Sequence, residues 1–247
     1  MNSTHLFKFL VLSLCLQALL APGLAALAQS KLETKRALSE SIVFQDNFDP
    51  PGDGKPKGSS GAGSRDALKC PEDAQPIRAL MPKRNYGLTL AERPSIFVHL
   101  PKTSAQQVVL MFQDQARKYY QRAFLPITTR AGIVSFTLPN DKPPLAVGKN
   151  YQWSLILVCG KTVQPDDPVV SGWVQRVGKT AKLDSELQQK SVIEQARWYG
   201  AKGYWYDMVN TIVQARRSHP YDVKLTNIWQ NLLDYGQLGS IVSETSR

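Results

Sequence analysis

The sequence predicts a mainly β fold, in which an antiparallel sandwich is followed by a helical tail. From residue 76 to 178, apolar and polar residues alternate with a period of two, and turn signals recur about every ten residues, as in all-β domains. Prolines fall between the alternating segments, where a missing backbone N–H does no harm. After Gly178 the apolar period becomes helical.

Seven strands are expected in the sandwich region. They span residues 77–81, 95–100, 107–113, 118–125, 132–138, 151–159 and 169–177. The sixth strand is the longest and alternates most regularly, so one of its faces should form the core. The residues on that face are Tyr151, Trp153, Leu155, Leu157 and Cys159. We expect Trp173 in the last strand to pair beside it.

Leu145, Gly148 and Tyr151 form a corner at the start of this strand. In fibronectin type III and related sandwiches, a corner tyrosine bonds through its hydroxyl back to the preceding loop. The spacing therefore predicts an immunoglobulin/fibronectin-III-like antiparallel sandwich over residues 76–178. A plain core tyrosine is the alternative.

The C-terminal region, residues 179–247, should contain three helices. The first ends at Gly200, the second runs over residues 204–218, and the third runs from an Asp222 cap to Tyr235. The apolar face of the first comprises Leu183, Leu187, Val192, Ile193, Ala196 and Tyr199. The order Ala196, Tyr199, Gly203, Trp205, Ala215, Pro220 resembles a single tetratricopeptide repeat, which the third helix would cap. One repeat is too few for a free solenoid, so this hairpin should pack on the sandwich or on a partner.

Residues 1–28 have the pattern of a secretory signal peptide, with cleavage after Ala28. The apolar run over residues 9–20 is too short to span a bilayer, which disfavours a membrane anchor. A lipoprotein anchor at Cys15 is also disfavoured, because bulky Leu14 precedes it. We therefore expect an exported protein, in the periplasm, outside the cell or at the cell surface.

Residues 29–75 should form a flexible linker, because polar and turn-forming residues dominate them. The glycines of residues 50–64 do not form a phosphate loop, since no strand precedes them and no helix follows. Ile42-Val43-Phe44 and Phe48 are the apolar exceptions. They could dock on the fold or bind a partner, but a transiently structured linker is the favoured interpretation.

Two cysteines, Cys70 and Cys159, remain after signal cleavage. In an oxidising compartment two cysteines most often pair, so we expect a disulfide. Its loop would contribute about 4 kcal/mol in the chain-entropy model. Two free thiols or a metal site are the alternatives, but His99 and His219 lack ligand spacing.

No motif in the chain indicates catalysis. His99 and His219 have no nucleophile motif beside them and are expected to be surface or capping residues. Asp166 and Asp167 suit a solvated turn better than a calcium site. We therefore expect a non-enzymatic protein without a cofactor or a metal.

Aromatic residues gather around the turn between the first two helices. Tyr199 and Trp205 are expected to be helix-packing core. Trp198, Tyr204 and Tyr206 are candidates for an exposed ligand or partner surface, with core packing as the alternative.

Positive charge is concentrated on the sandwich. Residues 76–178 hold 13 Lys and Arg against 5 Asp and Glu, within a chain of formal net charge +10. Arg117, Lys118 and Arg122 lie in the fourth predicted strand and the turn before it. This distribution favours an anionic polysaccharide, a lipid headgroup surface or an acidic envelope protein as partner, and nucleic acid is a poor candidate for an exported protein. A solubilising charge coat is the alternative.

A set of motifs occurs in a fixed order along the chain. They are Arg65-Asp66-x-x-x-Cys70, Leu80-x-Pro82-x-x-Asn85-x-Gly87-Leu88-Thr89, Pro94-x-Ile96-Phe97-Val98-x-Leu100-Pro101, Leu145-x-Val147-Gly148-Lys149-x-Tyr151-x-Trp153 and Gly172-Trp173-Val174-Gln175-Arg176-Val177. Together they resemble the cyanobacterial exported family called domain of unknown function 928, over roughly residues 50–240. The glycine-rich segment departs from the Arg-rich form that family members often carry. The resemblance implies export and no established activity.

We therefore expect an exported adaptor of the cell envelope. Its basic sandwich would dock on an anionic component, and its helical hairpin would bind a protein partner. A carbohydrate-binding module that uses the exposed aromatics is the second hypothesis, and an enzyme ranks last.

Overall fold

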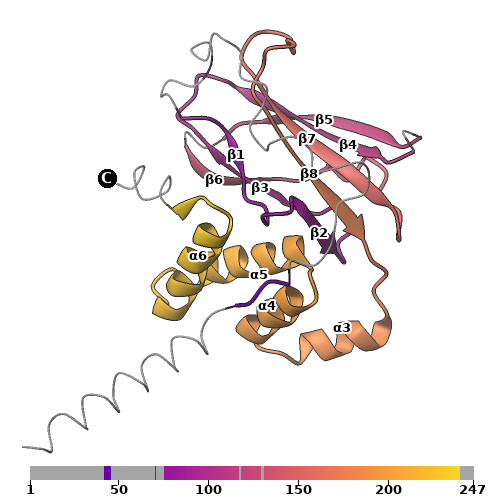
Figure 1. Cartoon of the computed structure of the whole chain (residues 1–247), viewed down its shortest axis with the longest axis vertical. Coiled ribbons are helices and arrows are strands. Elements are labelled where there is room, and N and C mark those ends of the chain that lie inside the picture. Colours follow the sequence, from indigo (N-terminus) through magenta and orange to yellow (C-terminus); the bar gives the residue numbers. More distant parts are fainter. Residues whose placement is uncertain (1–41, 46–69, 71–74, 117, 129–130, 240–247) are drawn as a thin grey trace, which may run out of the picture. The chain divides into compact units, whose positions relative to one another are not determined.

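The computed structural model describes residues 42–45, 70, 75–116, 118–128 and 131–239 (Figure 1). All of them belong to one compact unit that begins at Ile42. The predicted signal peptide over residues 1–28 lies outside the described residues, as does the glycine-rich part of the predicted linker. Both assignments stay predictions.

The β region forms two sheets, which confirms the mainly β prediction. A three-stranded sheet has the order β1-β3-β6, and a five-stranded sheet has the order β2-β8-β7-β4-β5. The bounds are β1 Arg78–Ala79, β2 Tyr86–Thr89, β3 Ile96–Leu100, β4 Gln107–Asp114, β5 Tyr120–Pro126, β6 Gly132–Phe136, β7 Asn150–Val158 and β8 Val169–Arg176. Each of the seven predicted strands has a counterpart at or near its predicted position.

Strand β2 was not predicted, and it pairs in parallel with β8, Tyr86 opposite Trp173. The prediction of a purely antiparallel sandwich is therefore wrong for this pair. All four residues of β2 are buried, so the strand lacks the alternation that marks a half-exposed strand. Asn85 turns the chain into it with a φ of 56°, and its side-chain amide donates to the carbonyl of Ser171 on β8.

The predicted core face of β7 is confirmed for four of its five residues, whereas Cys159 follows the strand and is half-buried. Tyr151, Trp153, Leu155 and Leu157 are fully buried. Antiparallel pairing places β8 beside β7 as expected, but Trp173 lies opposite Gln152 and therefore on the other face of the sheet from Trp153. The hydroxyl of Tyr151 accepts a hydrogen bond of 3.0 Å from the backbone N–H of Ala146 in the preceding loop. The corner tyrosine therefore makes the bond that its spacing predicts.

The C-terminal region contains α3 Ala181–Gln188, α4 Val192–Ala201, α5 Trp205–Ser218 and α6 Val223–Tyr235. The prediction of one helix ending at Gly200 is wrong, because α3 and α4 are separate. Ser191 and Glu194 form a reciprocal capping box that starts α4. The second and third predicted helices are confirmed as α5 and α6, and Asp222 caps α6 as expected.

Helix α5 lies against β2, the edge strand of the larger sheet (Figure 1). The two approach so closely that a Cβ on Gly87 would lie 2.6 Å from Cβ of Trp205. The indole N–H of Trp205 donates to the carbonyl of Leu80 at 3.0 Å. The hairpin thus packs on the sandwich, the first of the two predicted alternatives.

Candidate functional site

The outer strand β5 and the turn before it carry the described members of the predicted basic group. Strand β5 alternates in burial, with Ala123 turned inward, and its opposite face is exposed. On that face Tyr120 is 49% exposed and Phe124 is 52% exposed. The guanidinium carbon of Arg122 lies 5.8 Å from the ring centroid of Phe124. We call Lys118, Tyr120, Arg122 and Phe124 the β5 surface.

The turn before β5 is held by a buried carboxylate. Asp114 accepts hydrogen bonds from the backbone N–H groups of Lys118, at 2.6 Å, and Tyr119, at 3.0 Å. Lys118 is exposed in the turn just before the strand begins. Arg117, which was also predicted to belong to this surface, lies outside the described residues. The β5 surface therefore combines two described cations with two exposed aromatic rings.

A second group of predicted residues lies at the turn between α4 and α5. The rings of Trp198 and Tyr204 stack with centroids 5.4 Å apart and an interplanar angle of 11°. Tyr199 meets both edge-on, and all three side chains are half-buried. Burial raises the pKa of Tyr199 to about 12, so its phenol is neutral at physiological pH. Because Trp198 and Tyr204 cover one face of each other, they do not present two open rings side by side.

Tyr206 does not belong to an exposed surface, and that prediction is wrong. Only 3% of the residue is exposed. Its hydroxyl accepts from the indole N–H of Trp153 at 2.7 Å and donates to the carbonyl of Trp173 at 2.9 Å. Burial raises its pKa. Because α5 packs on β2, Tyr206 faces the sheet, where its hydroxyl supplies the acceptor that the buried indole N–H of Trp153 needs.

The predicted residues therefore form two separate groups. Strands β2 and β5 are the two outer strands of the five-stranded sheet. The α4–α5 hairpin lies at the β2 side, whereas Lys118 and Arg122 lie at the β5 side (Figure 1). A single ligand would have to span the sheet to contact both groups.

Sequence reasoning missed the role of Asp207. This residue lies in the first turn of α5, and its carboxylate accepts from the backbone N–H of Leu90 at 3.0 Å, just after β2. Burial raises the pKa of Asp207 to about 6, against the opposing effect of bonds from Leu90 and Thr89. An acidic residue in a first helical turn is ordinary in sequence, so no signal distinguished it.

Sequence reasoning also missed the docking of residues 42–45 against the helices. Phe44 is buried among the helices, and the N–H of Gln45 donates to the carbonyl of Gly200 at 2.9 Å. The interpretation of this stretch as linker is therefore wrong. The apolar triplet Ile42-Val43-Phe44 was the available signal, but its short length left docking as the weaker alternative.

Three other predictions concern polar residues. His99 is fully buried in β3, so its interpretation as a surface residue is wrong. Its strand lies between β1 and β6 and is buried at all five positions. His219 caps the C-terminus of α5 as expected. Asp167 is buried, and it accepts from the N–H groups of Cys159 and Gln164, so the solvated-turn interpretation fails there.

The disulfide between Cys70 and Cys159 is confirmed, with Cα atoms 4.9 Å apart. It links residue 70 to the chain just beyond β7. Among the residues that the structure describes, no three metal-ligating side chains gather into a group. No helix in the described part of the chain is long and apolar enough to cross a membrane.

A family model described as Domain of Unknown Function (DUF928) matches residues 60–246. The chain belongs to this family. The resemblance predicted from the sequence motifs is therefore confirmed, and the DUF928 match takes in both sheets and all four described helices. No curated protein matches this DUF928 chain.

Proposed function

We propose that this DUF928 protein is an exported, non-enzymatic adaptor of the cell envelope. Its β5 surface would dock on an anionic envelope component, and its helical region would bind a protein partner. The observation that carries the proposal is the β5 surface itself, where Lys118 and Arg122 stand beside two exposed aromatic rings.

This combination of side chains suits an anionic surface. A guanidinium presents several N–H donors in a planar fork that matches carboxylate and phosphate oxygens. Tyrosine and phenylalanine add apolar area that favours the boundary between headgroups and acyl chains. The surplus of positive charge over residues 76–178 would speed encounter with such a surface. A solubilising coat would not require exposed aromatic rings among its cations.

Binding to vesicles tests the proposal. The mature protein is mixed with phosphatidylcholine vesicles, with and without an anionic phospholipid, and bound protein is measured by sedimentation. We expect binding only to the anionic vesicles, falling as salt is raised because salt screens exposed charges. A parallel assay with an acidic polysaccharide separates lipid from glycan as the source of negative charge.

The decisive variant is Lys118→Glu/Arg122→Glu. The matched control is Lys83→Glu/Lys161→Glu, which makes the same change in net charge at exposed positions of the same domain, away from β5. We expect the first to weaken binding about tenfold or more, and the control about threefold or less. Equal losses would mean that total charge, not the β5 surface, drives association.

A carbohydrate-binding module is the second candidate function. It is favoured by the half-buried stack of Trp198 on Tyr204, whose remaining ring faces would contact a sugar. Glycan-array binding that Trp198→Ala abolishes would support it. A response to Lys118→Glu/Arg122→Glu alone would support the adaptor.

The finer assignments of fold and compartment belong to the same proposal. The hydroxyl bond of Tyr151 supports an immunoglobulin/fibronectin-III-like sandwich. A left-handed Gly203, with φ of 77°, supports a tight turn of tetratricopeptide type between α4 and α5, with α6 as its cap. The Cys70–Cys159 disulfide supports export to an oxidising compartment. Export is tested by sequencing the mature N-terminus, which should begin at Gln29.

A further inference from the structure

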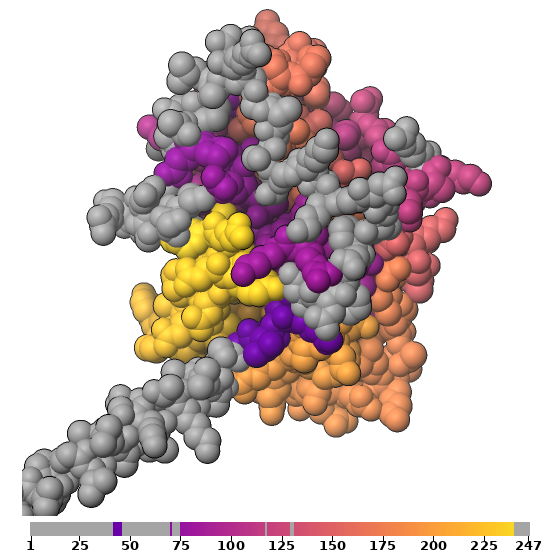
Figure 2. Space-filling model, in the orientation of Figure 1, coloured from indigo at the N-terminus to yellow at the C-terminus, as the bar shows by residue number. Residues whose placement is uncertain are grey.

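Residues 42–45 lie as a short surface segment between α6 and the α4–α5 hairpin (Figure 2). Burial alternates along the segment. Phe44 is 9% exposed and Ile42 is half-buried, whereas Val43 is 74% exposed and Gln45 is exposed. The segment therefore turns two apolar side chains toward the helices and two side chains toward solvent.

Helix α4 provides a site for the backbone of this segment. The N–H of Gln45 donates to the carbonyl of Gly200 at 2.9 Å. That carbonyl lies in the last turn of α4, where it also accepts from the N–H of Gly203 at 3.2 Å, so Gln45 uses the second acceptor position of the same oxygen. A Cβ on Gly200 would lie 2.7 Å from the carbonyl oxygen of Val43 and 2.9 Å from Cγ2 of Ile42. Only glycine at this position allows the segment to approach so closely.

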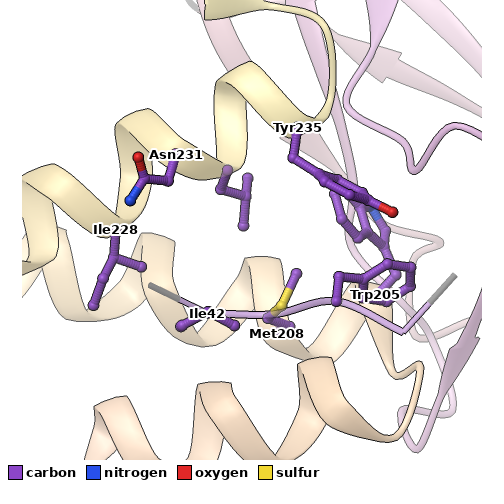
Figure 3. Close-up of a pocket in the computed structure, with 8 residues that line it drawn as sticks. Ile42, Trp205, Met208, Ile228, Asn231 and Tyr235 are labelled. Carbon is purple, nitrogen blue, oxygen red and sulfur yellow. The ribbon is translucent and has the colours of Figure 1, made fainter. Parts of the chain in front are cut away.

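Helices α5 and α6 provide sites for the two inward side chains. Phe44 packs edge-on against Trp205, with centroids 4.8 Å apart, and against Tyr235, at 5.8 Å. Ile42 borders a small cavity of about 20 Å³ that Met208, Ile228 and Asn231 also line (Figure 3). The segment thus leaves part of the space between α5 and α6 unfilled.

We infer that α4, α5 and α6 form a binding groove for an extended peptide with an aliphatic and an aromatic residue at alternate positions. Residues 42–45 are its resident ligand, and a partner segment of the same pattern takes their place. Extended peptides are recognised through backbone hydrogen bonds and through pockets for alternate side chains, which is the arrangement seen here. The partner's role rests on the adaptor proposal, but the groove itself does not.

The test uses a fluorescein-labelled peptide of residues 40–47 and the full mature chain. In wild type the resident segment competes with the peptide at high effective concentration. In Phe44→Ala the resident segment loses its anchor, so we expect fluorescence anisotropy to report binding about tenfold tighter or more. A control peptide with Ala in place of Phe44 should bind neither protein. Adding Gly200→Val to Phe44→Ala should abolish binding, because the new side chain fills the backbone site.

The groove is refuted if the peptide fails to bind folded Phe44→Ala, or if the control peptide binds equally well. Folding of each variant is checked by near-UV circular dichroism. If Phe44→Ala does not fold, amide hydrogen exchange of wild type decides. Protection of the Gln45 N–H by at least tenfold supports docking, and free exchange overturns it. No envelope component enters these assays, so failure of vesicle binding and failure of the groove are distinguishable.

Discussion

The two outer strands of the five-stranded sheet differ in how far other parts of the chain cover them. At β2, three consecutive residues of α5 cover the strand: Trp205 packs on Gly87, Tyr206 bonds into the sheet, and Asp207 caps the N–H of Leu90. At β5, the outward face keeps its cations and aromatic rings exposed.

This difference follows from the general problem of sheet edges. An outer strand offers unpaired backbone groups, and proteins protect it by covering it or by placing charge and proline on it. Helix α5 is the first solution, and β5, with Arg122 and a terminal Pro126, has the features of the second. Only the second solution leaves side chains available to a partner. The comparison therefore predicts large stability effects at β2 and binding effects at β5.

The largest expected contrast is between two aromatic truncations. Trp205→Ala removes a buried indole and its hydrogen bond to Leu80, which should cost about 3–5 kcal/mol of unfolding free energy. Phe124→Ala removes a ring that is half exposed and should change stability by about 0.5 kcal/mol or less. Urea unfolding of both variants measures the difference. Similar losses would mean that β5 is as fully covered as β2.

A smaller contrast comes from removing one hydroxyl at each edge. Tyr206→Phe leaves the buried indole N–H of Trp153 without its acceptor, which should cost about 2 kcal/mol. Tyr120→Phe loses only a 3.3 Å contact with the sulfur of Met111 and should cost about 0.5 kcal/mol or less. The same urea titrations compare the two. A Tyr206→Phe cost near zero would show that water replaces the hydroxyl at Trp153.

The next effect depends on pH and concerns only the covered edge. The pKa of Asp207 is about 6 in the folded chain and about 3.9 when unfolded. Because folding raises this pKa, its contribution to stability is full below about pH 4 and is lost as the pH rises through 6. The stability of Asp207→Asn relative to wild type should therefore rise by about 2 kcal/mol between pH 4 and 7. Melting temperatures across this range measure the gain, and a constant difference would contradict the buried carboxylate.

Sequence patterns predicted one edge far better than the other. The alternation over β5 and β7 reports which side chains face the core, because one face of each strand is more deeply buried than the other. Strand β2 is buried at all four positions, so it has no such pattern. Its burial depends on α5, which follows more than a hundred residues later in the chain, and no local signal reports a contact of that range.

The same reason explains the errors in the candidate site. Lys118 and Arg122 were predicted to belong to a partner surface because positive charge is concentrated on the sandwich, and both are indeed exposed. Tyr206 was misplaced, since helical period alone does not show which neighbouring aromatics face the sheet. Phe44 was assigned to a linker because its partners Trp205 and Tyr235 lie far along the chain. The hydrophobic period within a strand predicts which side chains are exposed. The contacts of Tyr206 and Phe44 join residues far apart in the sequence, so they depend on the tertiary fold.

The smallest expected effect tests whether residues 42–45 pack against α4, on the side of the molecule where α5 covers β2. In a helix, Gly→Ala normally stabilises by about 0.5–1 kcal/mol. At Gly200 the added methyl would meet the carbonyl of Val43, so we expect Gly200→Ala to lose about 1 kcal/mol instead. In a Phe44→Ala background the segment is no longer anchored, and the same substitution should return to a gain. A double-mutant cycle measured by urea unfolding reports this reversal as a coupling energy of about 1–2 kcal/mol. If Gly200→Ala raised the free energy of unfolding in both backgrounds, residues 42–45 would not lie against α4.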